Sequence, residues 1–296
     1  MQAFEYAVPE EVTSNSSGYE FLAYICATSF LSINNDIIFN FTKCKFFEGN
    51  LCAVLGNIIE SLKDRNNRIH FQELKGNLRG AFSRNGFLGR YSTAVEIPKT
   101  FATSLPYARF KMSDEVIANR FFRKELFGKE NMIRMSDLVQ KEIIRNIFEI
   151  CLNAHTHGGC EHVYCCGQFN LRKVPKLTLT LADLGKTIKA NVNNHLNQNF
   201  SGPEAIKWAL TEGNTTKTSA IPGGLGLKLV QSLIKLNKGK LQILSSNGLV
   251  EIHDGIITED LLALDFPGTI VTIELLLTDP NFYILQSEEN DWNNIF

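Results

Sequence analysis

The residues from 136 to 154 repeat their apolar side chains with the period of an α-helix. Ser136 is a favourable N-cap residue, and Asp137 places a negative charge in the first turn, where the helix dipole stabilises it. The apolar stripe that follows comprises Val139, Ile143, Ile147, Ile150 and Ala154. The pattern predicts a long helix that ends near Ala154 and buries one face in a core.

A polar row runs along the neighbouring face of this helix. It takes every fourth position, at Lys141, Arg145, Glu149 and Asn153. Glu149 and Asn153 therefore point the same way, one turn apart. Such a pair is usually part of a solvated helix face, but an Asn amide oxygen is also a suitable ligand for Mg²⁺ beside nucleotide phosphates.

Strand and helix signals alternate through the rest of the chain. The elements expected there are a strand over residues 176–181, a polar Asn-rich stretch over 191–199, a helix from the glycines at 223–226 to Ile234, two strands around an Asn247–Gly248 turn within 239–252, and a last strand over 269–277.

An earlier part of the chain has the pattern of a strand–helix–strand unit. Residues 36–41 and 68–71 have strand-like sequences, and the apolar positions from Leu51 to Leu62 have helical spacing. A right-handed crossover would make the two strands parallel. Residues 13–18, rich in Ser and Asn, are expected to form a loop.

The length and the glycine and proline positions indicate two domains. A chain of 296 residues is long enough for two cores, and Gly86, Gly89, Pro98 and Pro106 mark a boundary. We expect an α/β (α+β) protein with a small domain over residues 1–98, a second domain over residues 99–285 and a C-terminal tail over residues 286–296.

Composition excludes several classes of partner. The 30 Lys and Arg residues against 31 Asp and Glu residues leave a net charge of −1, which gives no general attraction to nucleic acid or to an anionic membrane. No apolar run approaches the ~20 residues of a membrane span, and the first residues lack a leader pattern. We therefore expect a cytoplasmic protein. The seven cysteines are expected to be reduced and mostly buried.

Gly185-Lys186-Thr187 matches the end of a phosphate-binding P-loop. That loop needs a glycine five residues before Gly185, where this chain has Thr180, so the P-loop interpretation is rejected.

Four other pieces form an ordered set. They are Glu149-x-x-x-Asn153-Ala154, Asp183-Leu184-Gly185, Gly223-Gly224-Leu225-Gly226-Leu227 and Gly268-Thr269. At these residues the chain resembles the GHKL ATPase superfamily, named for gyrase, heat-shock chaperone, histidine kinase and MutL. There the same pieces occur in this order, as an N box, a G1 box, a flexible lid, a G2 box and a Gly-Thr before the last strand. The resemblance covers about residues 105–280 and implies a two-layer α/β sandwich that binds ATP.

The resemblance implies a role for each piece. Asn153 would hold Mg²⁺, and Glu149 would be the catalytic base. Asp183 would accept a hydrogen bond from the adenine amine, with Gly185 and Thr187 beside the base; Thr187 stands where the family has a second glycine. Thr269 would support this adenine site.

The phosphates would be bound further along the chain. Residues Gly223, Gly224, Leu225, Gly226 and Leu227 would offer backbone N–H groups at a helix N-terminus. A lid over residues 190–222 would close on the triphosphate, and Lys217 could touch a phosphate from it. A solvated loop lysine is an equally good interpretation of Lys217, and Lys186 has the same two interpretations.

Half of the six histidines lie in a short segment with three cysteines. The segment contains His155, His157, Cys160, His162, Cys165 and Cys166, a density that could bind zinc. No CxxC pair occurs, however, and residues 162–166 fit a strand, so the thiols fit better as small core residues.

The N-terminal unit is similar to a STAS domain, a small α/β module of anti-sigma-factor antagonists. The similarity rests on residues 36–41, 51–62, 69–71 and 78–88. Antagonists carry a phosphorylatable Ser at the start of the helix, where this chain has Phe47-Glu48-Gly49-Asn50. A fixed interaction module is therefore the simpler interpretation.

Together these features predict a Mg²⁺-dependent, ATP-binding protein that hydrolyses ATP or transfers its γ-phosphate to a partner's Ser or Thr. The alternatives are an interaction switch gated by ATP with little turnover and a scaffold that binds no ligand. A protein partner at the STAS-like domain and a homodimer are both possible.

Overall fold

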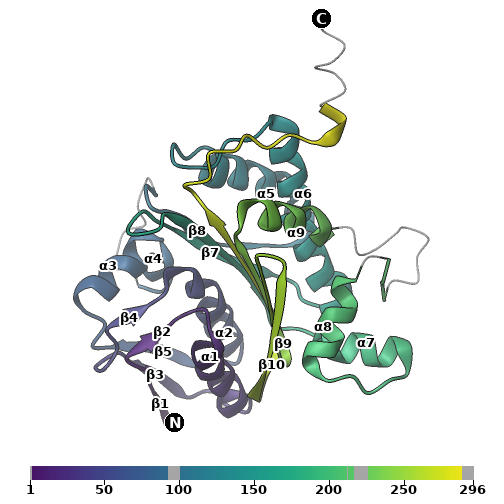
Figure 1. Cartoon of the computed structure of the whole chain (residues 1–296). Helices are drawn as coiled ribbons and strands as arrows, with labels where there is room; N and C mark the ends of the chain where they lie inside the picture. Colours follow the sequence, from purple (N-terminus) through teal and green to yellow (C-terminus); the bar gives the residue numbers. More distant parts are fainter. Residues whose placement is uncertain (1, 93–100, 212, 217–225, 289–296) are drawn as a thin grey trace, which may run out of the picture.

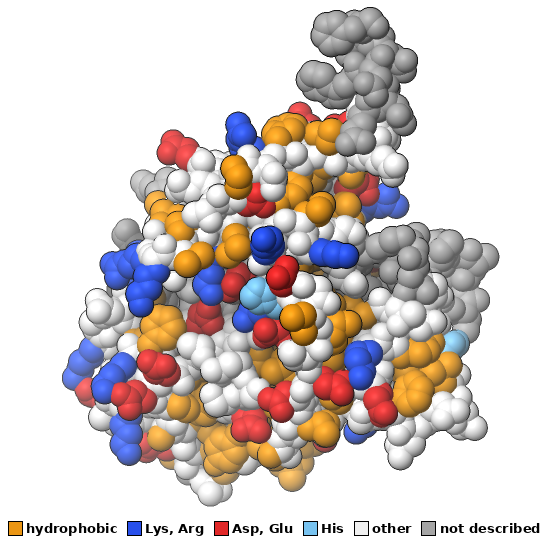
Figure 2. All heavy atoms as spheres, viewed as in Figure 1, with side chains coloured by type: hydrophobic (Ala, Val, Ile, Leu, Met, Phe, Trp, Pro, Cys, Tyr) orange, Lys and Arg blue, Asp and Glu red, His pale blue; other side chains and the backbone are white. Residues whose placement is uncertain are grey.

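The computed structural model describes residues 2–92, 101–211, 213–216 and 226–288, with the backbone alone at Met112 and at residues 226–228. These ranges form a mixed α/β protein with two small parallel sheets, one of three strands and one of two, and one five-stranded antiparallel sheet (Figure 1). Within them, no helix combines the length and the apolar character needed to cross a lipid bilayer. Acidic and basic side chains are interspersed over the face in Figure 2, in keeping with the net charge of −1.

The N-terminal unit, residues 2–92, is built on a three-stranded parallel sheet in the order β1-β3-β5. Its elements are β1 (Ala3–Ala7), β2 (Glu11–Val12), α1 (Ser16–Ser29), β3 (Asp36–Asn40), β4 (Phe46–Phe47), the 3₁₀ turn η1 (Gly49–Leu51), α2 (Cys52–Asp64), β5 (Arg68–Gln72), α3 (Gly76–Arg84) and α4 (Phe87–Tyr91). Helices α1 and α2 provide the crossovers that parallel strands require.

The strand–helix–strand prediction for this unit is confirmed by β3, α2 and β5. The loop expected over residues 13–18 is wrong in its second half, since α1 begins at Ser16. Asn15 is its N-cap and accepts a hydrogen bond from the Gly18 N–H at 2.9 Å. The Ser- and Asn-rich run is therefore a helix start, a position that these residues favour as much as they favour loops.

Residues 101–288 form a five-stranded antiparallel sheet in the order β6-β7-β8-β10-β9, with helices. The elements are β6 (Ser104–Phe110), η2 (Met112–Asp114), α5 (Glu115–Phe122), the π-helical turn η3 (Arg123–Phe127), α6 (Asp137–Gly158), β7 (Val163–Asn170), β8 (Lys176–Asp183), α7 (Ile188–Leu196), α8 (Gly202–Leu210), α9 (Gly226–Asn237), β9 (Lys240–His253) and β10 (Ile256–Leu276). The expected helix over 136–154 and the strand over 176–181 are confirmed, whereas most of the polar stretch over 191–199 belongs to α7.

The turn expected at Asn247–Gly248 is wrong. Both residues lie inside β9, and the chain reverses instead around Gly255, at a φ of +77°. A Cβ on Gly248 would overlap the backbone of Gly202, at the N-terminus of α8. The glycine therefore permits a helix to pack closely on a strand, a use that the local sequence does not distinguish from a turn.

The central strands present their alternate residues to two different cores. Leu179, Leu181 and Val271 pack with α6 and α9, whereas Ala182 and Ile270 pack with the N-terminal unit. The five-stranded sheet thus lies between the N-terminal unit and a layer of helices that includes α6 and α9 (Figure 1).

Buried polar side chains join the N-terminal unit to the sheet. Asn50 donates to Ser14 Oγ at 2.9 Å and to Thr180 Oγ1 at 2.8 Å. The hydroxyls of Thr180 and Thr272 are 2.9 Å apart, and the Tyr19 hydroxyl lies 3.1 Å from that of Thr272. The two parts therefore share a hydrogen-bond network as well as an apolar core.

The boundary expected near residue 98 lies outside the described residues. The C-terminal tail expected from residue 286 is described only to residue 288, where Glu288 accepts a hydrogen bond from the Ser136 hydroxyl at 2.7 Å.

Candidate functional site

Helix α6 supplies one wall of the candidate site. The Ser136 hydroxyl accepts from the Val139 N–H at 3.1 Å, which confirms the expected N-cap. The helix continues past Ala154 to Gly158 and stops at Gly159, whose φ of +71° suits glycine. The extra turn places His157 one turn beyond Asn153, which is itself one turn beyond Glu149.

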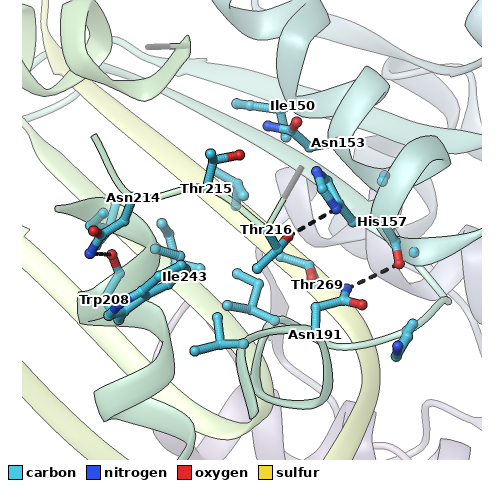
Figure 3. A pocket seen from close by; sticks show the side chains of 18 of the residues that line it. Ile150, Asn153, His157, Asn191, Trp208, Asn214, Thr215, Thr216, Ile243 and Thr269 are labelled. Atoms are coloured by element: carbon cyan, nitrogen blue, oxygen red, sulfur yellow. Dashed lines mark hydrogen bonds between the residues drawn. The ribbon is translucent and has the colours of Figure 1, made fainter. Parts of the chain in front are cut away.

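A pocket opens between α6, the end of β8, an interior part of β10, and helices α7 and α8. Its wall includes Asn153, Asp183 and Thr269, three of the residues singled out in the sequence. Figure 3 shows Asn153 and His157 on the α6 side, with Trp208 and Asn214 on the opposite side. Residues far apart in the chain are thus gathered around one cavity.

Glu149 lies one turn before Asn153 on α6 and is half-buried. It is not among the residues that line the pocket, although its neighbour Ile150 is. The predicted base therefore stands beside the pocket.

Asp183 ends β8 as a buried carboxyl group in the pocket wall, with 5% of its surface exposed. Burial raises the pKa of this carboxyl group to about 7, and hydrogen bonds from the Cys160 thiol and the Thr269 backbone N–H lower it in part. The carboxyl group consequently titrates near neutral pH.

Thr269 is held opposite Asp183 in the β8–β10 pairing. Its hydroxyl lies 3.1 Å from that of Ser245, which also donates to the Gly268 carbonyl at 2.8 Å and accepts from the Ile188 N–H at 2.9 Å. A Cβ on Gly268 would overlap the Asp183 carbonyl. The Gly-Thr pair thus permits close approach of the two strands.

The residues after Asp183 have different positions. Gly185 packs on the end of α6, because a Cβ there would overlap the Cys160 sulfur and approach the Gly158 carbonyl. Lys186 lines the pocket. Thr187 is the N-cap of α7, with its hydroxyl accepting from the Ala190 N–H at 3.1 Å, and it does not line the pocket.

The segment expected to be a lid is largely helical where it is described, as α7 and α8. The residues that follow α8 reach the pocket: Asn214, Thr215 and Thr216 line it, and the Thr216 hydroxyl lies 3.1 Å from His157 Nδ1 (Figure 3). Lys217, Gly223, Gly224 and Leu225 lie outside the described residues. Gly226 and Leu227 begin α9.

The histidines and cysteines of residues 155–166 have separate surroundings. Cys165 and Cys166 are both buried and face opposite cores, as a strand requires. His155 Nδ1 lies 2.9 Å from the Cys160 carbonyl. In the described part of the chain, no three His, Cys, Asp or Glu side chains gather as a metal site would need.

His157 and Trp208 line the pocket and Ser245 contacts Thr269, but the motifs that predict a nucleotide site include none of the three. His157 could have been found, since it continues the four-residue spacing of Glu149 and Asn153. No local pattern distinguishes Trp208 or Ser245, because their positions depend on how α8 and β9 pack.

The fold and pocket thus define a mixed α/β protein with a cavity beside an antiparallel sheet. No protein-family model matches the chain, and no curated protein matches it.

Proposed function

We propose that this protein binds ATP with Mg²⁺ in the pocket beside α6, in the manner of the GHKL ATPases. The observation that carries the proposal is that Asn153, Asp183 and Thr269, from three separate sequence pieces, line one cavity. The N-terminal parallel sheet, the antiparallel sheet and its helical layer are compatible with such a domain following a STAS-like one.

The residues of the pocket wall suit both the purine base and the Mg²⁺-bound phosphates of ATP. Asp183 and Thr269 lie together in the wall, where a carboxylate and a hydroxyl can bind the polar edge of a purine. Asn153 is half-buried in the wall and offers an amide oxygen, which suits a cation that keeps most of its ligands as water and phosphate. When bound, Mg²⁺ would neutralise charge on the phosphate oxygens.

The reaction proposed is hydrolysis of ATP or transfer of its γ-phosphate to a partner's hydroxyl. Glu149 would act as the base, because it stands one turn from Asn153 on the same side of α6. Lys217 and residues 223–227 would contact the phosphates, as the resemblance implies.

A specific observation also favours the alternative, an ATP-gated interaction switch. Residues of β8 and β10 that line the pocket alternate with residues that contact the N-terminal unit: Asp183 and Thr269 face the pocket, and Ala182 and Ile270 face that unit. Ligand binding at one face of these strands could therefore change how the other face is held.

Titration calorimetry with Mg-ATP tests the proposal. We expect binding that requires Mg²⁺ in the wild-type protein and falls at least ~10-fold in Asn153→Ala, since one cation ligand is lost. Absence of magnesium-dependent ATP binding by the wild-type protein would contradict it.

The role of Glu149 is tested separately with labelled ATP. Glu149→Gln should bind ATP about as tightly as the wild type, yet release or transfer labelled phosphate at least ~100-fold more slowly. Equal turnover in the two proteins would eliminate the base role alone, and binding without turnover in the wild type would favour the switch.

A further inference from the structure

Cys160 is held in one place by the end of α6. Its N–H donates to the Ala154 carbonyl at 3.2 Å, just after the left-handed Gly159. His155 Nδ1 lies 2.9 Å from the Cys160 carbonyl. Hydrogen bonds thus hold both the N–H and the carbonyl of Cys160, and they fix the position of its Cα atom.

The thiol of Cys160 reaches the candidate site. Sγ donates to Asp183 Oδ1 at 3.2 Å, and both side chains are buried, with 8% and 5% of their surfaces exposed. The contact fits only because glycines flank it: a Cβ on Gly185 would overlap Sγ, and a Cβ on Gly158 would lie 3.1 Å from it.

The chemistry of the pair favours a stable donor and acceptor. Burial and the nearby Asp183 charge raise the pKa of the Cys160 thiol, so the sulfur keeps its proton. The thiol and the Thr269 N–H both donate to the carboxyl group, which lowers the pKa of Asp183 against the effect of burial. His157 and Lys186 share the pocket wall, and Cys151 lies behind it on α6.

We propose that Cys160 is a positioning residue for the ligand: its thiol orients the Asp183 carboxylate, and the pocket thereby prefers a purine with an exocyclic amine over one with a carbonyl at that position. The inference rests on the proposed nucleotide site and adds to it a residue that none of the GHKL-like boxes contains. Without the thiol, the carboxylate would lose one of its two donors, and the group would turn or take up a proton. Either change removes the acceptor that an amine needs.

The test compares adenine and inosine nucleotides, which carry an amine and a carbonyl at that position. Calorimetry with Mg-ATP and Mg-ITP is carried out on the full-length wild type, Cys160→Ala, Cys160→Ser and Cys151→Ala. The last variant removes another buried α6 thiol, one whose contacts are with the apolar core.

We expect Cys160→Ala to bind Mg-ATP ~10-fold more weakly, the effect of one hydrogen bond to a charged group, with Mg-ITP affinity nearly unchanged. Cys160→Ser keeps a donor and should retain the preference for ATP, and Cys151→Ala should behave as the wild type. The pH midpoint of Mg-ATP binding should also rise in Cys160→Ala, because the Asp183 carboxyl group loses a hydrogen bond that stabilises its charge.

Several outcomes would overturn the inference. If Cys160→Ala loses affinity equally for Mg-ATP and Mg-ITP, or keeps the wild-type preference for ATP, the thiol contributes only packing and does not orient the carboxylate. If Cys160→Ala does not fold, a Cys160→Ser protein that folds but has lost the preference overturns it as well. Wild-type protein that binds neither nucleotide contradicts the proposed function itself, whereas selective wild-type binding with an indifferent Cys160 contradicts only this inference.

Discussion

Asp183 is a carboxyl group in surroundings that disfavour its charged form. A carboxyl group in water ionises well below neutral pH, but this one is buried with a thiol and a backbone N–H as its hydrogen-bond donors. The raised pKa means that the carboxyl group is partly protonated near neutral pH. The ionised form of such a group destabilises the folded protein, and carboxyl groups with perturbed pKa values are common at ligand-binding sites.

The raised pKa predicts a pH-dependent stability. The folded pKa of about 7 exceeds the unfolded value of 3.8, so the native state binds more protons between these pH values, and stability falls as pH rises through that window. Asp183→Asn removes this contribution. The free energy of unfolding of the variant should exceed that of the wild type by up to ~4 kcal/mol at pH 8 and should equal it below pH ~4. Urea unfolding of the ligand-free proteins measures the difference. A difference that does not vary with pH would contradict the assigned titration.

At the scale of elements, glycines determine where the helices that line the pocket end and how closely they pack. Gly159 ends α6 just after His157, which lies in the pocket one turn beyond Asn153, and the chain then brings Cys160 to Asp183. Gly248 allows α8 to pack on β9, and α8 supplies Trp208. The pocket therefore depends on backbone contacts as much as on its own side chains.

The close approach at Gly248 can be tested directly. Gly248→Ala should lower the free energy of unfolding by about 2 kcal/mol or more, because the new Cβ would meet backbone atoms that cannot turn away. Gly80→Ala is the matched control: in α3 its Cβ meets only the flexible end of Arg84, so a gain of ~0.5–1 kcal/mol is expected. Thermal unfolding of both variants supplies the measurement, and a neutral Gly248→Ala would refute the close packing.

Thr187 is expected to act through α7. Thr187→Ala should cost ~1 kcal/mol of stability, since the Ala190 N–H loses its cap, and Thr187→Ser should restore it. Chemical denaturation compares the three proteins. If Thr187→Ala is as stable as the wild type, the cap contributes nothing, and any effect on nucleotide binding would come from contact with the ligand.

At the scale of the whole molecule, the five-stranded sheet serves two cores at once. Its β8 strand carries Leu181 toward α6, Ala182 toward the N-terminal unit, and Thr180 into the polar network with Asn50. Because each strand contributes to both sides, the two parts of the chain should unfold together.

The polar network provides the corresponding prediction. Asn50→Ala removes a buried amide that donates to the half-buried Ser14 and the buried Thr180, and should cost ~2–4 kcal/mol, with a single unfolding transition in calorimetry. Asn40→Ala, at a half-buried position of β3 whose side-chain hydrogen bonds are exposed to solvent, should cost less than ~1 kcal/mol. Two separate transitions in the wild type would show that the units fold independently.

The sequence by itself determined the elements with strong periodicity and the order of the polar pieces. Helical spacing located α2 and α6, and alternation located β8, because both patterns reflect a single buried face that local residues record. The tertiary structure alone decided that α1 begins within a loop-like run, that Asn247–Gly248 lies in a strand, and that Cys160 meets Asp183. Those outcomes depend on contacts between distant segments, and the free energy of such contacts exceeds the weak local preferences that a sequence displays.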